Sequence, residues 1–186
     1  MSIDKKELRR EMKALRRTFS GDLKRRADRM ICDSVLTLAR ARKDRPVLLY
    51  CALPDEVSLD EAIRSLLSEG VEVAVPKVLG KTMAFRLIRS FDDLEEGCMQ
   101  IREPKDSCPV YEAEGSLVLV PGLAFSEDGR RLGYGGGFYD AYFSRHPGNL
   151  LAGVCYSFQA GKDVPAEPHD LPVGMVVTEK GVTRCG

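Results

Sequence analysis

A glycine-rich stretch near the C-terminal third of the chain constrains the fold and the function most. An apolar run over 116–120 predicts a buried strand, and Asp128-Gly129 is a turn signal after it. Four glycines fall within residues 133–137, where missing Cβ atoms would let a ligand approach the backbone. Aromatic residues at helical spacing follow, so we expect a helix to start near Gly137. A strand, a glycine loop and a helix N-terminus together predict an anion site that suits phosphate.

A glycine-rich run alone is as typical of a flexible connection or a tight turn as of a ligand site. Neighbouring residues favour the ligand. Arg130 and Arg131 precede the glycines and suit phosphate oxygens. Asp140 follows one helical turn later, where a carboxylate suits a magnesium ion that bridges phosphates. Phe138 and Tyr139 offer flat surfaces to a ring. The run is neither a P-loop, because no Gly-Lys-Ser/Thr ends it, nor a dinucleotide-binding fingerprint, because it lies far from the N-terminus.

Length and composition predict one domain over residues 1–186. We see neither a signal peptide nor a run of transmembrane length, so we expect no membrane partner. The six cysteines include no C-x-x-C pair and lie apart from His146 and His169. This spacing argues against a zinc site and is typical of reduced thiols, so we expect a cytoplasmic protein.

The N-terminal region is basic although the whole chain has a formal net charge of +0. Residues 1–45 contain 15 Lys and Arg against 7 Asp and Glu. An excess of this kind suggests a phosphate-bearing or polyanionic partner, although a solvated helix face is the simpler interpretation of most of these charges. Periodicity predicts an amphipathic helix over 4–17 and a second helix that Ser20 caps. The expected buried positions are Leu8, Met12 and Leu15 in the first helix and Leu23, Ala27, Met30, Ile31, Val35 and Leu38 in the second.

The middle of the chain predicts an α/β fold, namely three α/β/α layers with a mostly parallel central sheet and the N-terminal helices packed on it. Apolar runs predict the strands, and a capping box of Ser58 and Glu61 predicts a helix that ends at Glu69. Ligands of such folds bind at the carboxyl ends of the strands, where Glu56 falls. By spacing alone, Glu56 is a loop carboxylate and Met83 a core residue. The predicted strands span residues 46–52, 71–75, 83–88, 116–120, 150–155 and 175–178.

The glycine-rich stretch resembles the signature of the 5-formyltetrahydrofolate cyclo-ligase family, also called methenyltetrahydrofolate synthetase. The matching residues are Pro-Gly-Leu-Ala-Phe at 121–125 and the run over 129–140. Weaker resemblance extends over nearly the whole chain. Two positions depart from the family pattern, since Ser126 and Gly174 stand where the family often has Asp.

The resemblance implies ATP-dependent cyclisation of 5-formyltetrahydrofolate to 5,10-methenyltetrahydrofolate, with ATP as co-substrate and Mg²⁺ as cofactor. It implies catalytic roles for Arg131 and Asp140, and Asp140 as the metal ligand. It implies folate contacts from Glu56, Met83, Phe138 and Tyr139. The implied ATP contacts are Lys5, Arg9, Arg16, Arg131, Leu132, Gly133, Tyr134, Gly135, Gly136, Gly137, Phe138 and Tyr139.

Such a reaction needs no covalent nucleophile from the protein, because transfer of the γ-phosphoryl group to the formyl oxygen would activate the carbon for attack by N10. We expect the folate substrate and ATP as partners, without nucleic acid, and a monomer or weak oligomer. Two alternatives remain open at this point. One is a nucleotide- or RNA-binding relative that does not consume folate, and the other is a sugar-phosphate isomerase or transferase on a similar sheet.

Overall fold

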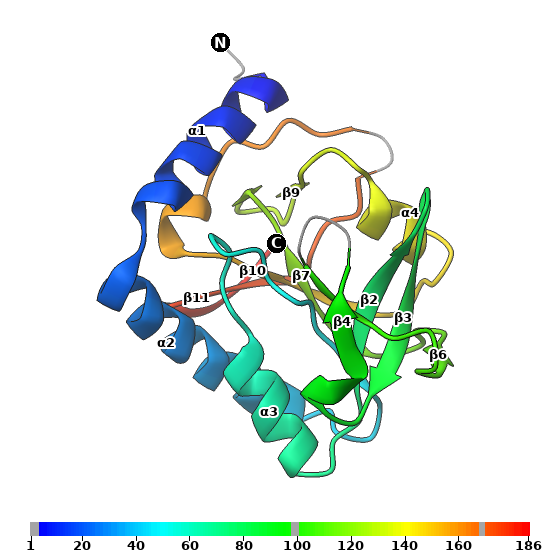
Figure 1. The fold of residues 1–186 in the computed structure, drawn as a ribbon. Helices are drawn as coiled ribbons and strands as arrows, with labels where there is room; N and C mark the ends of the chain where they lie inside the picture. The colour runs from blue at the N-terminus through cyan, green and yellow to red at the C-terminus, as the bar shows by residue number, and fades with distance from the viewer. Residues whose placement is uncertain (1–3, 98–100, 168–169) are drawn as a thin grey trace.

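The computed structural model describes residues 4–97, 101–167 and 170–186 (Figure 1). Eight strands form one sheet in the spatial order β12-β11-β10-β7-β1-β2-β3-β6. The central strands from β11 to β2 pair in parallel, whereas the strands at both edges run antiparallel. The mostly parallel sheet predicted from the sequence is therefore confirmed. The strands are β1 (Val47–Leu48), β2 (Val73–Leu79), β3 (Thr82–Ile88), β6 (Val110–Tyr111), β7 (Leu117–Pro121), β10 (Leu150–Val154), β11 (Met175–Thr178) and β12 (Gly181–Arg184).

Side chains of the central strands alternate between two hydrophobic clusters, one on each face of the sheet. Val47 and Leu49 belong to the cluster that also contains buried residues of the helices α2 (Gly21–Arg40) and α3 (Asp60–Ser68). Leu48 belongs to the opposite cluster, with buried residues of α4 (Phe138–Phe143). The helices therefore cover both faces, which gives the three layers seen in Figure 1. This burial explains why these strands are nearly continuous apolar runs.

The first helix, α1 (Lys5–Thr18), rests on a small hairpin instead of on the large sheet. The hairpin consists of β8 (Ala124–Phe125) and β9 (Arg131–Leu132), which pair antiparallel. Leu8 and Met12 of α1 pack against Leu132 and other hairpin residues in a cluster of their own. Of the two N-terminal helices, α2 thus packs on the sheet, whereas α1 is held beside the glycine loop that follows β9.

Three residues expected inside the N-terminal helices are exposed. The exposed fractions are 40% for Leu15, 69% for Leu23 and 45% for Met30. Arg16, in contrast, is only 1% exposed. The reason is the spacing of four residues along α1, which places Arg16 on the buried side below Leu8 and Met12.

The predicted capping interactions are not formed. Ser20 is the N-cap residue of α2, but its side chain makes no capping hydrogen bond. The capping box at α3 is wrong, because the helix begins at Asp60 with Leu59 as its N-cap. The Ser58 hydroxyl instead accepts a 3.4 Å hydrogen bond from the backbone N–H of Asp60.

The strand predicted over 71–75 continues through Pro76 and forms a hairpin with β3. Proline fits because its missing N–H would have faced away from β3. Two residues further, on the same side, the N–H of Val78 donates to the Glu103 carboxylate at 3.2 Å. Glu103 belongs to a separate two-stranded sheet of β4 (Leu94–Glu96) and β5 (Arg102–Pro104), which lies against β2.

Within the described ranges, no helix has the length and apolarity that a bilayer span requires. The cysteines of these ranges, at positions 32, 51, 108, 155 and 185, are free thiols.

Candidate active site

Two cavities adjoin beyond the carboxyl ends of β7 and β1, at the edge of the sheet where α/β proteins bind ligands. We call them the polar cavity, of about 380 Å³, and the apolar cavity, of about 400 Å³. The polar cavity is lined by Lys5, Arg9, Pro121, residues 131–141, Ser144, Glu167 and Asp170. The apolar cavity is lined by Tyr50, Cys51, Leu53, Glu56, Pro76, Val78, Gly80, Met83, Ile101, Arg102, Glu103, Pro121, Tyr134, Gly136, Phe138 and Tyr139. Five residues line both, namely Pro121, Tyr134, Gly136, Phe138 and Tyr139.

The glycine loop forms one wall of the polar cavity with its backbone. Gly135 has a φ of +106° and Gly137 a φ of +64°, values that favour glycine over any residue with a Cβ. Gly137 is the N-cap residue of α4, so the predicted helix start is confirmed. A Cβ on Gly136 would lie 2.8 Å from the Phe138 ring. Leu132 also lines the polar cavity, and its side chain is 1% exposed and packs under α1.

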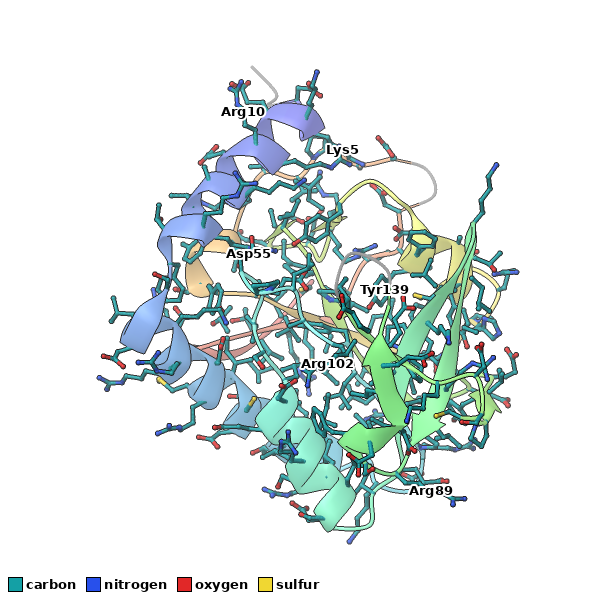
Figure 2. All side chains as sticks on the ribbon, viewed as in Figure 1. Lys5, Arg10, Asp55, Arg89, Arg102 and Tyr139 are labelled. Carbon is teal, nitrogen blue, oxygen red and sulfur yellow. The ribbon has the colours of Figure 1, made fainter. Side chains whose placement is uncertain are left out.

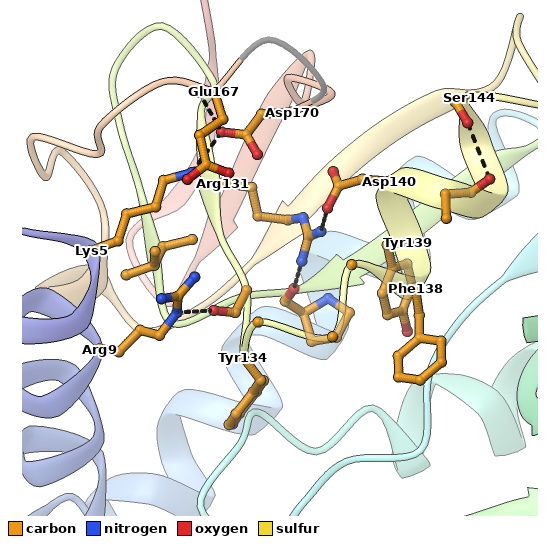
Figure 3. A pocket seen from close by; sticks show the side chains of 17 residues that line it. Lys5, Arg9, Arg131, Tyr134, Phe138, Tyr139, Asp140, Ser144, Glu167 and Asp170 are labelled. Carbon is orange, nitrogen blue, oxygen red and sulfur yellow. Dashed lines mark hydrogen bonds and ion pairs between the residues drawn. The ribbon is translucent and has the colours of Figure 1, made fainter. Parts of the chain in front are cut away.

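Arg131 and Asp140 face each other across the glycine loop. One terminal nitrogen of Arg131 donates to a carboxylate oxygen of Asp140 at 2.7 Å, and the other donates to the carbonyl of Pro121 at 3.3 Å (Figure 3). The second carboxylate oxygen of Asp140 accepts from the backbone N–H of Leu171 at 3.3 Å. The Arg131 guanidinium also lies 5.4 Å from the centre of the Tyr139 ring. The structure therefore brings together both residues implied as catalytic.

The helix α1 turns two basic side chains toward the loop. The Nε of Arg9 donates to the carbonyl of Gly133 at 3.0 Å. Lys5 forms ion pairs of 2.9 Å with Asp170 and 3.1 Å with Glu167, as Figure 3 shows. Arg10 lies on another side of the same helix and points away from the molecule (Figure 2). One face of α1 thus supplies positive charge to the polar cavity.

Arg16 does not line the polar cavity, although the resemblance implied an ATP contact for it. Its Nε and one terminal nitrogen donate to the Asp55 carboxylate at 3.2 and 2.5 Å. Its other terminal nitrogen lies 3.7 Å from a carboxylate oxygen of Glu56, and its guanidinium lies 5.4 Å from the Tyr134 ring centre. Arg16 thus connects α1 to the loop after β1 and to the glycine loop.

Glu56 and Met83 are both buried and both line the apolar cavity, 6% exposed each. The Glu56 carboxylate accepts a 2.9 Å hydrogen bond from the backbone N–H of Leu53. Burial raises the pKa of Glu56 above its ordinary value, although the Leu53 bond and the charge of Arg16 act against this rise. Burial also raises the pKa of Tyr139. The cavity therefore offers the Glu56 carboxylate in mostly apolar surroundings, beside a second carboxylate, Glu103, which accepts from the Val78 N–H.

A magnesium site in the polar cavity rests on Asp140. Within residues 4–97, 101–167 and 170–186, no three or more His, Cys, Asp or Glu side chains gather as a metal site would require. Mg²⁺ bound with a nucleotide keeps several waters and takes one or two protein carboxylates besides phosphate oxygens. The partly exposed Asp140 carboxylate fits this mode of binding, whereas a site made of protein ligands alone does not fit.

Several cavity residues were missed by the sequence analysis. Tyr50, Pro76 and Val78 line the apolar cavity near the ends of β1 and β2. The signal that could have found them is their place at the carboxyl ends of neighbouring strands. Ser144 and Asp170 were likewise missed in the polar cavity.

Arg130, expected to contact phosphate, instead pairs with Asp128 at 2.9 Å outside both cavities. Ser126, one of the two departures from the family pattern, closes the same turn. Its hydroxyl donates to Asp128 at 2.5 Å and accepts from the Arg130 N–H at 2.9 Å. Gly174, the other departure, donates its N–H to Leu151 at 2.9 Å. His169 lies outside the described residues.

The fold and the paired cavities define an α/β protein that can bring a phosphate-bearing ligand and an apolar ring ligand together. The family model of the 5-formyltetrahydrofolate cyclo-ligase family matches residues 1–179. The chain therefore belongs to the 5-formyltetrahydrofolate cyclo-ligase family. It is 30% identical over 205 residues to the 5-formyltetrahydrofolate cyclo-ligase of Saccharomyces cerevisiae, an alignment that covers 95% of this chain and 96% of the yeast protein.

Solved structures agree with this assignment. The structure of Aquifex aeolicus 5,10-methenyltetrahydrofolate synthetase is similar with a TM-score of 0.86 at 34% identity, over 97% of this chain and 92% of that chain. The synthetase from Mycoplasma pneumoniae has a TM-score of 0.77 at 22% identity, over 95% and 99% of the two chains, and shows the same fold.

Proposed function

We infer that this protein converts 5-formyltetrahydrofolate to 5,10-methenyltetrahydrofolate at the expense of ATP, with release of ADP and phosphate. The observation that carries this inference is the junction of the two cavities at Tyr134, Phe138 and Tyr139. A reaction that transfers a phosphoryl group between two bound molecules needs adjoining sites of different chemistry. Membership of the cyclo-ligase family supports the same reaction.

The polar cavity is our proposed ATP site. Lys5, Arg9 and Arg131 bring positive charge to it, and the loop glycines let phosphates approach backbone N–H groups. Lys5 would exchange part of its contact with Asp170 for a phosphate oxygen. Arg16 has no contact with ATP in this proposal. It acts through Asp55 and Tyr134, which it holds in place.

The apolar cavity is our proposed folate site. Glu56 accepts hydrogen bonds from the amino-pyrimidine part of the pteridine, a role that suits a carboxylate. Met83 and the ring of Phe138 pack against the flat apolar parts of the substrate. Tyr139, which lines both cavities, lies where the formyl oxygen and the γ-phosphoryl group would meet.

The proposed chemistry has two steps. The formyl oxygen attacks the γ-phosphorus, the bond to the bridging oxygen breaks, and ADP leaves. N10 then attacks the formyl carbon and loses its proton, and the C–O bond breaks so that phosphate leaves with the oxygen. Arg131 stabilises the charge on the transferred group, and the cavity walls exclude water from the phosphorylated intermediate.

Asp140 would hold Mg²⁺ in the polar cavity. When bound with ATP, the ion would neutralise part of the negative charge of the phosphates. The chain's own contribution is the position of the carboxylate, which Arg131 and the Leu171 N–H fix from opposite sides.

Absorbance of the methenyl product separates this function from the two alternatives. The assay contains 5-formyltetrahydrofolate with and without Mg-ATP. We expect product only with both ATP and a divalent ion. Neither a nucleotide- or RNA-binding relative nor a sugar-phosphate enzyme would form this product, with or without ATP. Full turnover in EDTA without nucleotide would overturn the ATP-dependent reaction.

A further inference from the structure

A third cavity, of about 330 Å³, opens between the β2–β3 turn and α4, and we call it the side cavity. It shares Met83 and Phe138 with the apolar cavity, and Phe138, Ala141 and Ser144 with the polar cavity, so it borders both. The remaining lining includes Lys81 from the turn, and Ser144 and Arg145 from the end of α4. None of the functions proposed above uses the side cavity.

The side cavity is positively charged. No Asp or Glu is among its lining residues. Within the described part of the chain, neither Lys81 nor Arg145 forms an ion pair. The Nε of Arg145 donates to the carbonyl of Ala141 at 3.1 Å, which fixes the guanidinium but leaves its two terminal nitrogens for a ligand.

Other cations around the apolar cavity are already neutralised. Arg102 donates to both carboxylate oxygens of Asp60 at 2.7 Å. Lys77 pairs with Glu95 at 3.2 Å and with Asp106 at 2.9 Å. Arg9 of the polar cavity is also outside the ion pairs of the described residues, but the phosphates of ATP occupy that cavity in the proposed function. An anionic group that leaves the apolar cavity past Met83 and Phe138 therefore meets the uncompensated charges of Lys81 and Arg145.

We propose that the side cavity is the subsite for the glutamate carboxylates of the folate substrate, with Lys81 and Arg145 as the groups that bind them. This inference rests on the proposed function. The pteridine end of 5-formyltetrahydrofolate requires Glu56, and the p-aminobenzoyl ring lies against Met83 and Phe138. The glutamate then emerges where these two residues border the side cavity. A guanidinium binds a carboxylate through two parallel hydrogen bonds, and a lysine adds a second charge.

The test compares two substrates, 5-formyltetrahydrofolate and 5-formyltetrahydropteroate, which lacks the glutamate. The variant is the double substitution Lys81→Gln with Arg145→Gln. We expect its KM for 5-formyltetrahydrofolate to rise by about tenfold while kcat stays within about twofold, since both contacts are exposed. We expect its KM for 5-formyltetrahydropteroate to match that of the parent protein.

A matched control is Arg89→Gln with Lys43→Gln, which removes the same charge from exposed residues that line none of the three cavities. We expect parental KM values for both substrates from this control. Titration calorimetry of both substrates without ATP measures the same difference as a Kd.

The outcomes separate the subsite from the reaction. A Lys81/Arg145 variant with parental KM and Kd for 5-formyltetrahydrofolate overturns the subsite and leaves the proposed function intact. An equal rise in KM for both substrates also overturns it, because the effect would not depend on the glutamate. A parent protein that neither binds nor converts 5-formyltetrahydrofolate overturns the proposed function, and the subsite with it.

Discussion

The guanidinium of Arg131 donates a 2.7 Å hydrogen bond to the carboxylate of Asp140, and this ion pair joins the two ends of the glycine loop. Arg131 lies in β9 before the loop, and Asp140 lies in α4 after it. The side chains are 8% and 18% exposed, so the pair is largely withdrawn from water. Loop geometry and the charge of the proposed metal ligand therefore depend on the same contact.

We predict that Asp140→Asn folds but loses activity. Asparagine keeps the size and one oxygen acceptor for Arg131 but removes the charge that would attract Mg²⁺. We expect kcat/KM at limiting magnesium to fall by about 10- to 100-fold, with partial recovery at high magnesium. The measurement is kcat over a magnesium series, with the melting temperature taken on the same preparation.

The competing interpretation is that Asp140 stabilises only α4 and its pair with Arg131. An acidic residue in the first turn of a helix contributes about 0.3–1 kcal/mol. That role would lower the melting temperature slightly and leave the magnesium dependence of kcat unchanged. Such a result would remove Asp140 as a metal ligand.

We predict that Lys5→Ala with Arg9→Ala raises the KM for ATP. Each charge-assisted phosphate contact is worth about 1.5–3 kcal/mol, so we expect a rise of at least about tenfold. The matched control is Lys6→Ala with Arg10→Ala, which removes two exposed charges from the same helix. Should the Lys5/Arg9 variant match this control in ATP KM, the two residues have no role in nucleotide binding.

The sequence predicted the elements that burial determines and missed those that depend on partners distant in the chain. The run over 116–120 had to become a central strand, because its residues are apolar throughout. The predicted apolar stripe of α1 was wrong at one position. Leu15 was expected to be buried and Arg16 was not, on the polarity of the two side chains alone. Arg16 is buried because Asp55, 39 residues away, accepts its hydrogen bonds, and no local pattern contains that information.

The candidate site shows the same division. The glycine loop and the start of α4 could be predicted from the sequence, because positive φ angles and helix starts have local sequence signals. The apolar cavity was found only in part, because its residues come from segments far apart in the chain: Tyr50 follows β1, Pro76 lies in β2 and Ile101 precedes β5. The sequence did not predict the ion pair of Arg131 with Asp140 either, since Arg131 by itself suits a phosphate and Asp140 by itself suits a metal ion.

We predict that Arg16→Met lowers the free energy of unfolding by about 3–5 kcal/mol. Removal of one partner from a buried ion pair leaves the other charge uncompensated, here Glu56 at 7% side-chain exposure. Urea denaturation measures the change. Arg10→Met, on the exposed side of the helix, should change the value by less than about 0.5 kcal/mol. Similar stability of the two variants would mean that Arg16 adds nothing to the folded state.

We predict that the affinity for 5-formyltetrahydrofolate depends on the ionisation of Glu56. Burial raises the pKa of Glu56 above 4.5, so its carboxylate is protonated at a higher pH than an exposed glutamate. Protonation removes the acceptor for the pteridine amino group. The KM for 5-formyltetrahydrofolate should therefore rise as the pH falls through this raised pKa, whereas Glu56→Gln should show a high KM without that inflection.

The contribution of Glu56 to stability should change with pH in the opposite direction to the affinity. This difference separates the binding role of Glu56 from a structural one. A carboxyl group with a raised pKa in the folded state contributes stability that is present below pH 4.5 and is lost as the pH rises through the folded pKa. As the pH rises through the folded pKa, the affinity of the parent protein for 5-formyltetrahydrofolate should therefore increase. Over the same pH range, the contribution of Glu56 to the free energy of unfolding should decrease. Calorimetric Kd values and urea midpoints at matched pH measure both. If affinity and stability instead both decrease as the pH falls, the pH effect on binding comes from unfolding and not from the Glu56 carboxylate.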